Sequence, residues 1–414
     1  MRYCLFFLVA VQFVLALPGL AVGADSDPLQ VHLDALRAKG AAPVDFVVEA
    51  LDSVDLLIFD DALHTAVEPF AFYEQLLRDP RFRERARYVF LELAPVNHQP
   101  ALDAYLAAED DDPSLLYPLF QDVGDLGLTY ATYFDLLRTV REVNATLTED
   151  ERLRVVAVSD PTRWCEIHTY EDLEIDRRNY LYRDYLMYSF ILDELGGFES
   201  GRKGIFLTNT RHAYTGIRRA DGDLYWNCGT FFRQRHPGRT MSIRIHNASL
   251  YFARRKSAEE TGAATSQGLE GIEVHWVRVA DGLWDSAFDA CRLPQVAVPL
   301  AGTPFGEAPY IGNHMLDAAP GQTMADAYDA VISLAPLEKM HKTAKRGDLY
   351  TPEFRREAAR RYRIMYTPEQ IEENLAADGV ETVEELIATY AESEPEQPLP
   401  QAQAVGPLDA WRDR

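Results

Sequence analysis

Four short apolar runs in this chain each end in polar residues that can do chemistry. Runs of β-branched, aromatic and leucyl residues without alternation are typical of strands buried on both faces, as in a parallel sheet. In open α/β sheets, ligands bind outside the carboxyl ends of the strands. The sequence therefore predicts a pocket at that edge of a sheet. The runs are residues 56–59 before Asp60 and His64, 88–91 before Glu92, 155–158 before Asp160, and 204–207 before His212.

Segments with helical periodicity separate these runs, so that strands and helices alternate along most of the chain. Alternation of this kind predicts an α/β fold with a mostly parallel central sheet, helices on both faces, and a helical C-terminal extension. The expected helices cover residues 28–39, 67–77, 100–108 and 133–143, and further strands are expected at 242–246, 272–279 and 330–334.

The longest helical pattern spans residues 170–195, has a wide apolar face and stops at Gly196 and Gly197. Residues 215–240 are rich in Gly, Arg and aromatic residues, which favours a hairpin or an insertion on the substrate side. Thr367 begins a capping-box pattern that predicts the start of a late helix.

The two ends of the chain differ in composition from the rest. A positive start, an apolar stretch at residues 5–17 and small residues before Asp25 predict a cleaved signal peptide, with an uncleaved anchor as the alternative. We therefore expect an exported protein, periplasmic or secreted, with no membrane span after cleavage. The expected division is 1–24 signal peptide, 25–345 α/β domain, 346–391 helical extension and 392–414 disordered tail rich in Pro, Glu, Gln and Ala.

The bulk composition narrows the class of partner. A net charge of −24 argues against nucleic acid and against anionic membrane surfaces as partners. The partner expected for the predicted pocket is a small-molecule substrate or ligand. Cys165, Cys228 and Cys291 form neither a disulfide framework nor a close-spaced zinc motif, and their pairing stays open. The sequence contains no P-loop, Gly-rich dinucleotide turn or Gly-x-Ser-x-Gly elbow, which disfavours nucleotide binding and a serine nucleophile.

The first strand end carries a histidine with a carboxylate four residues later. If a helix begins near His64, its side chain and that of Glu68 share a face and hydrogen-bond. A carboxylate beside a histidine fixes its tautomer and raises its basicity, as general-base catalysis requires. The structural alternative is a helix start at which Asp60 and Asp61 favour the helix dipole.

The other strand ends supply further candidates. Glu92 directly follows four apolar residues, and a buried carboxylate there must be paired, protonated or bound to a ligand, because a lone buried charge is costly. Asp160 holds the same place after the third run, where it either binds a substrate or caps a turn. Arg183 and Asp184 precede the fourth run, and an arginine there can clamp a carboxylate or stabilise an oxyanion. His212 repeats the strand-end arrangement.

Taken in order, these residues resemble the erythromycin esterase-like superfamily, which includes the ChaN-like and TIKI-like proteins. In that superfamily one strand ends in a Gly-Glu-x-x-His type motif with a glutamate shortly after it, and a second strand ends in glutamate. A helix then carries Arg-Asp-x-x-Met, and a later strand ends in histidine. The matching positions here are residues 60–64 and 68, Glu92, residues 183–187 and His212, within roughly residues 40–340. Asp60 and Asp61 stand in place of Gly-Glu, so the chain resembles a diverged member.

The resemblance implies an exported hydrolase that attacks an ester or similar acyl bond with a histidine-activated water and needs no cofactor. In this hypothesis His64 is the general base, and Glu68 or Glu92 orients it. His212 and Arg183 polarise the carbonyl or stabilise the oxyanion. The carboxylates predicted to bind the substrate are Asp61, Asp160 and Asp184.

Two alternatives remain open from the same resemblance. A TIKI-like hydrolase would use His64, Glu92 and His212 as ligands of a divalent metal, since two histidines and a carboxylate suit a catalytic ion with an open position. A ChaN-like protein would bind haem in the same pocket without catalysis.

Overall fold

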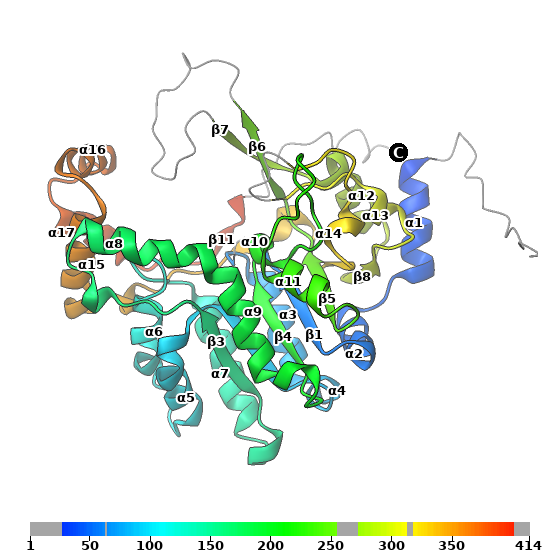
Figure 1. Ribbon diagram of the computed structural model, residues 1–414, viewed down its shortest axis with the longest axis horizontal. Coiled ribbons are helices and arrows are strands. Elements are labelled where there is room, and N and C mark those ends of the chain that lie inside the picture. The colour runs from blue at the N-terminus through cyan, green and yellow to red at the C-terminus, as the bar shows by residue number, and fades with distance from the viewer. Residues whose placement is uncertain (1–26, 63, 255–271, 313–317, 401–414) are drawn as a thin grey trace, which may run out of the picture.

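The computed structural model describes residues 27–62, 64–254, 272–312 and 318–400 (Figure 1). Its centre is a seven-stranded sheet in the order β3-β2-β4-β1-β5-β9-β8. All neighbouring strands are parallel except β8 and β9. The predicted α/β fold with a mostly parallel sheet is confirmed. The strands are β1 Leu56–Asp60, β2 Tyr88–Pro95, β3 Arg154–Ser159, β4 Gly204–Thr208, β5 Thr240–Ile245, β8 Val296–Pro299 and β9 Ala330–Ser333.

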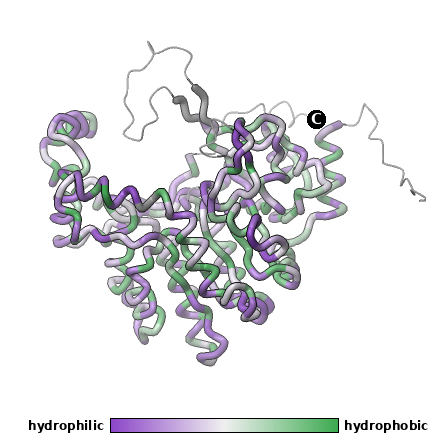
Figure 2. The backbone as a smooth tube through the Cα atoms, viewed as in Figure 1, coloured by the Kyte–Doolittle hydropathy of each residue, from purple (hydrophilic) through white to green (hydrophobic). Residues whose placement is uncertain are grey.

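Strand β1 lies in the middle of the sheet and is buried along its whole length. Leu57 and Phe59 belong to one hydrophobic cluster, whereas Leu56 and Ile58 belong to the cluster on the other side. Because successive side chains of a strand point to opposite faces, both faces of β1 need apolar residues. This explains the absence of alternation in the run. Hydrophobic segments fill the interior, and hydrophilic ones dominate the periphery (Figure 2).

Helices cover both faces of the sheet, as predicted. The larger cluster receives side chains from α2 Pro43–Ser53, α3 Val67–Arg78, α4 Pro80–Arg83, α5 Gln99–Ala107, α6 Tyr117–Gln121, α7 Ala131–Asn144, α15 Pro352–Met365 and α17 Val383–Tyr390. The other cluster receives them from α1 Pro28–Lys39, α9 Arg183–Glu194, α10 Thr210–Ala213, α11 Cys228–Arg235, α12 Leu283–Ala290, α13 Pro304–Glu307 and α14 Met324–Ala327.

The long helical pattern at residues 170–195 is divided in the structure. It forms α8 Tyr170–Arg177, a 3-10 turn at Arg178–Tyr182, and then α9. The two helices pack on different partners, since Leu173 of α8 joins a small cluster with Met365 of α15, whereas Met187 of α9 packs in the cluster on the sheet. Tertiary contacts therefore break a segment that local propensity makes continuous.

Two other expectations need adjustment. The predicted strand at residues 272–279 is β7 Ile272–Val277, and it pairs with β6 Ser249–Arg254 in a separate hairpin rather than joining the central sheet. Within residues 215–240, Arg218 and Leu224 form an antiparallel bridge before α11 begins.

The cysteines at positions 165, 228 and 291 are free thiols.

The C-terminal helices pack on the main core. Phe354 of α15 and Leu386 of α17 belong to the larger cluster, and α16 Pro368–Asp378 begins with the predicted capping box at Thr367. Residues 392–400 have a defined path, unlike the disorder expected from residue 392 onward, because Leu399 is buried in a small apolar cluster. There β11 Gln397–Pro398 pairs with β10 His341–Lys342.

The predicted signal peptide (1–24) and the end of the predicted tail (401–414) lie outside the described residues. Within the described ranges, no helix combines the length and apolar character needed to cross a membrane.

Candidate functional site

Three of the four polar positions that follow the apolar runs converge at the carboxyl edge of the sheet, although β2 continues past Glu92 to Pro95. Strands β2, β4 and β1 are neighbours, so Glu92, His212 and His64 meet although they lie far apart in the sequence. Glu92 lies between the two histidines: its Oε2 is 3.1 Å from Nε2 of His64, and its Oε1 is 3.3 Å from Nε2 of His212. All three side chains are at most 5% exposed. The predicted convergence is present, and it is buried.

Glu92 is held as a carboxylate by hydrogen bonds from β4 and its following residue. The hydroxyl of Thr208 donates to Oε2 at 2.5 Å, and the backbone N–H of Asn209 donates to the same oxygen at 3.1 Å. A buried charge needs such donors to offset its desolvation. The carboxylate is therefore fixed in position before any ligand binds.

His64 lies in a tight turn that its neighbouring aspartates stabilise. Its Nδ1 is 2.9 Å from Oδ2 of Asp61, and its backbone N–H donates to Oδ1 of Asp61 at 3.0 Å. Ala62 and His64 both have positive φ, 68° and 61°, a conformation that costs non-glycine residues energy and is found at functional sites. Asp60 accepts a hydrogen bond from the N–H of Ala62 at 2.9 Å. The paired aspartates thus hold a strained turn that aims the imidazole at Glu92.

His212 is oriented from its other side by helix α9. Its Nδ1 donates to Oδ1 of Asp184 at 2.7 Å, and Asp184 is itself held by the backbone N–H of Cys228 at 2.8 Å. The Nε2 atom of His212 is buried and makes no hydrogen bond, although it faces Glu92. Asp184, predicted to bind substrate, instead fixes the histidine ring.

Arg183 brings the remaining cation to the cluster. Its guanidinium contacts Oε1 of Glu92 and Oδ1 of Asp160, each at 3.2 Å, and it also donates to the hydroxyl of Ser159. Arg183 is 15% exposed and Asp184 is 24% exposed, more than the residues at the three converging strand ends. A ligand would therefore approach the cluster from the side of α9.

Glu68 does not belong to this cluster, contrary to the sequence-based prediction. Helix α3 begins at Val67, so His64 lies before the helix and the expected i, i+4 pairing does not exist. The carboxylate of Glu68 instead accepts from the backbone N–H and the ring of His341, at 3.1 and 3.0 Å. The carboxylate contacts predicted between Glu68 and His64 are instead made by Asp61 and Glu92.

The charges of the cluster shift its pKa values. Burial lowers the pKa of His64, but the carboxylates of Asp61 and Glu92 raise it further, to about 10. Burial likewise opposes charge on His212, and Asp184 and Glu92 raise its pKa overall. Burial favours the neutral form of Glu92, yet the two imidazoles hold its pKa well below the usual range. At neutral pH a carboxylate therefore lies beside a protonated His64.

This arrangement predicts a loss of stability at alkaline pH. The folded-state pKa of His64 exceeds its ordinary value of 6.5, so its contribution is complete below pH 6.5 and is lost as the pH rises toward about 10; His212 acts in the same direction. Urea titrations at pH 6.5, 8.5 and 10 should show the free energy of unfolding falling along this range. The decline should be smaller in His64→Gln and unchanged in His341→Gln, since His341 is exposed. Equal slopes in all three proteins would contradict the assignment.

Several residues of the site carry no signal in the sequence. Thr208 and Asn209 follow the fourth run as ordinary polar residues, and Tyr133 of α7 packs its ring edge-to-face on His64 with centroids 6.1 Å apart. The hydroxyl of Tyr133 is buried without a hydrogen bond. The position of Thr208 and Asn209 directly after an apolar run is the one sequence signal that could have suggested this pair. Tyr133 has no such signal.

Asp60 has a structural role beside the site. Its carboxylate accepts from the hydroxyls of Thr210 at 2.8 Å and Tyr328 at 2.6 Å, and the buried guanidinium of Arg244 is 3.6 Å away. These contacts tie together the ends of β1, β5 and β9. Asp60 and Asp61 therefore differ in function, since only Asp61 contacts a histidine of the cluster.

The alternative metal ligands lie together but contact one another. Within the described ranges, no three His, Cys, Asp or Glu side chains are arranged to hold an ion. Both ring nitrogens of His64 lie within hydrogen-bond distance of carboxylates, whereas a metal ligand must direct a free lone pair at the ion. These residues do not fit a metal centre as they stand.

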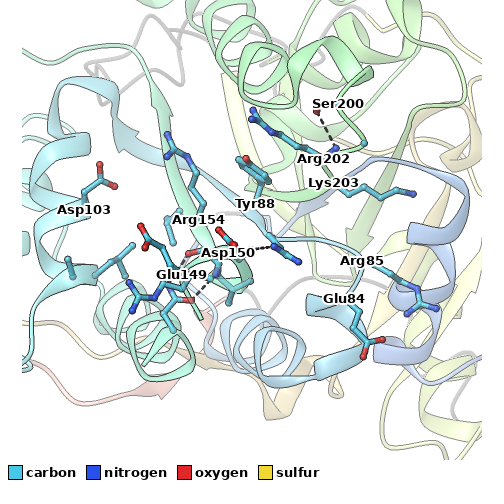
Figure 3. A pocket seen from close by; sticks show the side chains of 18 residues that line it. Glu84, Arg85, Tyr88, Asp103, Glu149, Asp150, Arg154, Ser200, Arg202 and Lys203 are labelled. Atoms are coloured by element: carbon cyan, nitrogen blue, oxygen red, sulfur yellow. Dashed lines mark hydrogen bonds between the residues drawn. The ribbon is translucent and has the colours of Figure 1, made fainter. Parts of the chain in front are cut away.

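Two hollows lie at opposite edges of the sheet. One, of about 620 Å³, is at the amino edge, with Asp103 on one side and Glu84 and Arg85 on the other (Figure 3). It holds none of the residues predicted for the site, and Arg85 and Arg154 pair with Asp52 and Glu194. The other, of about 780 Å³, lies at the carboxyl edge, and its lining includes Pro161 and Tyr182, the chain neighbours of Asp160 and Arg183. The carboxyl edge therefore holds the candidate site.

Comparison with known proteins supports the fold. The sequence matches no protein-family model and no curated protein. The structure is similar to that of a succinoglycan biosynthesis protein, with a TM-score of 0.50 and 8% identity over 74% of this chain and 97% of that chain. It is also similar to a Bacillus cereus protein (TM-score 0.45, 12% identity, 75% and 98% covered) and to a mutant of the erythromycin esterase EreC in its open conformation (0.46, 11%, 70% and 93%). At 8% identity, the similarity to the succinoglycan biosynthesis protein concerns the fold alone.

Proposed function

We propose that this protein is a hydrolase that attacks an ester or a similar acyl bond with an activated water molecule. The observation that carries the proposal is the pair formed by Asp184 and His212, which leaves Nε2 of His212 without a hydrogen bond inside a cluster that also contains His64 and Arg183. A histidine oriented by a carboxylate can activate a water molecule as a general base, and fixed cations nearby can stabilise the oxyanion that forms when the water attacks a carbonyl.

The contacts favour His212 as the general base and His64 as a group that stabilises the oxyanion. The sequence-based hypothesis assigned these two roles the other way round. A base needs a lone pair that is free to accept a proton, and both ring nitrogens of His64 are hydrogen-bonded to carboxylates. In His212 the bond from Nδ1 to Asp184 places the ring proton on Nδ1 once the ring is neutral. Its Nε2, buried and 3.3 Å from Glu92, is then the ring nitrogen whose lone pair can accept a proton from water that enters with the substrate.

The remaining groups suit the stabilisation of negative charge. As Nε2 of His212 takes a proton from water, the water oxygen attacks the carbonyl carbon and the carbonyl oxygen becomes an oxyanion. The protonated His64 and the guanidinium of Arg183 are cations held beside Glu92, where such an oxyanion would be stabilised without rearrangement. Collapse expels the alcohol, which takes the proton back from His212, so that ester and water give acid and alcohol.

The pH dependence of hydrolysis tests this proposal. Because Asp184 and Glu92 raise the pKa of His212, its basic form appears only above the ordinary histidine value of 6.5, and kcat/KM on p-nitrophenyl esters should rise with pH above that value. Asp184→Asn removes one of the raising charges, so the rising limb should move to lower pH. The maximum should also fall by about 10²–10⁴-fold, since the amide no longer holds the correct tautomer.

A matched control lies on the same helix. Asp193 of α9 is exposed, so Asp193→Asn changes the net charge equally and should leave the pH profile in place. A profile that is the same in Asp184→Asn and in the parent would refute His212 as the base. Loss of activity on chelation, with recovery on adding zinc, would instead support the metal-dependent alternative.

A further inference from the structure

The hollow beside Arg183 has walls that are unusually apolar for a surface. It lies between α8 and α9 and has a volume of about 780 Å³, within the roughly 300–1,000 Å³ typical of small-molecule pockets. Its apolar lining includes Val96, Ile175, Tyr182, Tyr185, Leu186 and Phe190. Several of these side chains remain exposed to water, so packing in the hydrophobic core does not explain why they are apolar.

The exposed apolar residues of the described chain concentrate here. Ile175 is 57% exposed and Tyr182 is 66% exposed, and Tyr185 is also exposed. Tyr170 and Leu181, from the same segment, are exposed as well but are not part of the lining. Single exposed apolar residues are ordinary, but a contiguous group around a hollow marks a binding surface.

The charged groups of the lining are already engaged with the protein. Arg163 and Glu166 are 3.6 Å apart, and Asp172 caps the start of α8 by accepting from the N–H groups of His168 and Thr169. Burial is the main cause that raises the pKa of Asp176, with a contribution from Asp160. The hollow therefore offers mainly apolar surface, and Pro161, which directly follows Asp160 along the chain, is part of its lining.

The outer wall is held in place by the C-terminal extension. Arg360 of α15 donates to the backbone carbonyls of Trp164 at 2.8 Å and Ile167 at 2.6 Å. Glu357 fixes that guanidinium with two contacts of 2.6 and 2.7 Å. A wall that is fixed before binding reduces the entropy lost when a ligand enters.

We infer that this hollow binds an uncharged apolar group of the substrate, such as a medium-length alkyl chain. The inference rests on the proposed function for the identity of the scissile bond, but not for binding itself. Tyr182 directly precedes Arg183 along the chain, so an apolar group in the hollow would place the attached ester beside the guanidinium. The expected substrates are esters with one bulky apolar part.

Two measurements test the inference separately from the chemistry. Binding of decan-1-ol, measured by calorimetry, should weaken at least about fivefold in the double variant Ile175→Ser, Tyr182→Ser, because each buried methylene favours binding. The control is Leu293→Ser, a comparably exposed leucine remote from the hollow, which should bind like the parent. Equal binding by all three proteins, or no binding by the parent, would overturn the inference.

Hydrolysis provides the second readout. The ratio of kcat/KM for p-nitrophenyl octanoate to that for the acetate should fall at least about fivefold in the double variant and stay constant in Leu293→Ser. Binding of decan-1-ol without hydrolysis of any ester would overturn the proposed function and leave the apolar site intact. Hydrolysis with a chain-length ratio unaffected by the double variant would overturn the apolar site alone.

Discussion

Replacing Glu92 by Gln should reduce kcat/KM for ester hydrolysis by about 10²–10³-fold, the effect of removing one preorganised electrostatic group from an active site. The glutamine amide has the same shape as the carboxylate, but it can accept hydrogen bonds only at its oxygen, whereas the carboxylate accepts them at both Oε1 and Oε2. Oε2 of Glu92 accepts from Thr208 and Asn209 and faces His64, while Oε1 faces His212 and Arg183. A glutamine must present an N–H either to the donors on Oε2 or to the guanidinium of Arg183 on Oε1, which removes bonds and disturbs the cluster.

The same substitution should change the titration of both histidines. Glu92 raises the pKa of His64 and of His212, so both values should fall in Glu92→Gln. Imidazole resonances followed by NMR across the pH range measure this without any substrate. The matched control is Glu68→Gln, because Glu68 contacts His341 and lies outside the cluster. Comparable losses in the two variants, or unchanged histidine titration in Glu92→Gln, would contradict the central place given to Glu92.

The second large effect concerns stability and lies in the C-terminal extension. Arg361 of α15 is 4% exposed, contacts Asp122 at 2.6 Å and Glu357 at 2.9 Å, and covers the ring of Trp164 at 4.7 Å. It also donates to the carbonyl of Gln121 at 2.7 Å. Arg361→Ala should lower the free energy of unfolding by about 2 kcal/mol, because it removes charge-assisted hydrogen bonds to Asp122 and to the carbonyl of Gln121 and packing over an indole.

Chemical denaturation of two variants of the same helix checks this value. Arg356 is 71% exposed and contacts Glu353 at 3.3 Å, so Arg356→Ala should cost no more than about 0.5 kcal/mol. Trp164 fluorescence reports on the contact directly and should change in Arg361→Ala alone. Similar losses in both variants would mean that the extension is held by its apolar residues and not by this arginine.

The fold was predictable because its signals are local. The composition of residues 56–59 and 204–207 alone predicts buried central strands. The polar residues that follow them indicate the carboxyl edge of the sheet. The parallel order of the strands then brings His64, Glu92 and His212 together without further information. The identity of the cluster could therefore be read from the sequence.

The partners within the cluster could not be read in the same way. Whether His64 belongs to a helix depends on the left-handed turn at Ala62, which the carboxylates of Asp60 and Asp61 stabilise, and no periodicity reports this. A sequence pattern therefore assigned Glu68 to a histidine that it does not contact. Pairings across strands, such as Thr208 with Glu92, depend on register, which local composition does not specify.

The strand order has a consequence for the way the protein reaches its native state. On its two sides Leu56 of β1 pairs with Gly204 and with Thr240, so β1 stays without either neighbour while about 150 further residues are synthesised. At typical rates of translation this interval is on the order of ten seconds or more. Contacts between residues so distant in the chain form slowly, because the intervening loop must close first. The apolar run that marks the centre of the sheet is thus also the segment most exposed to aggregation in a nascent chain.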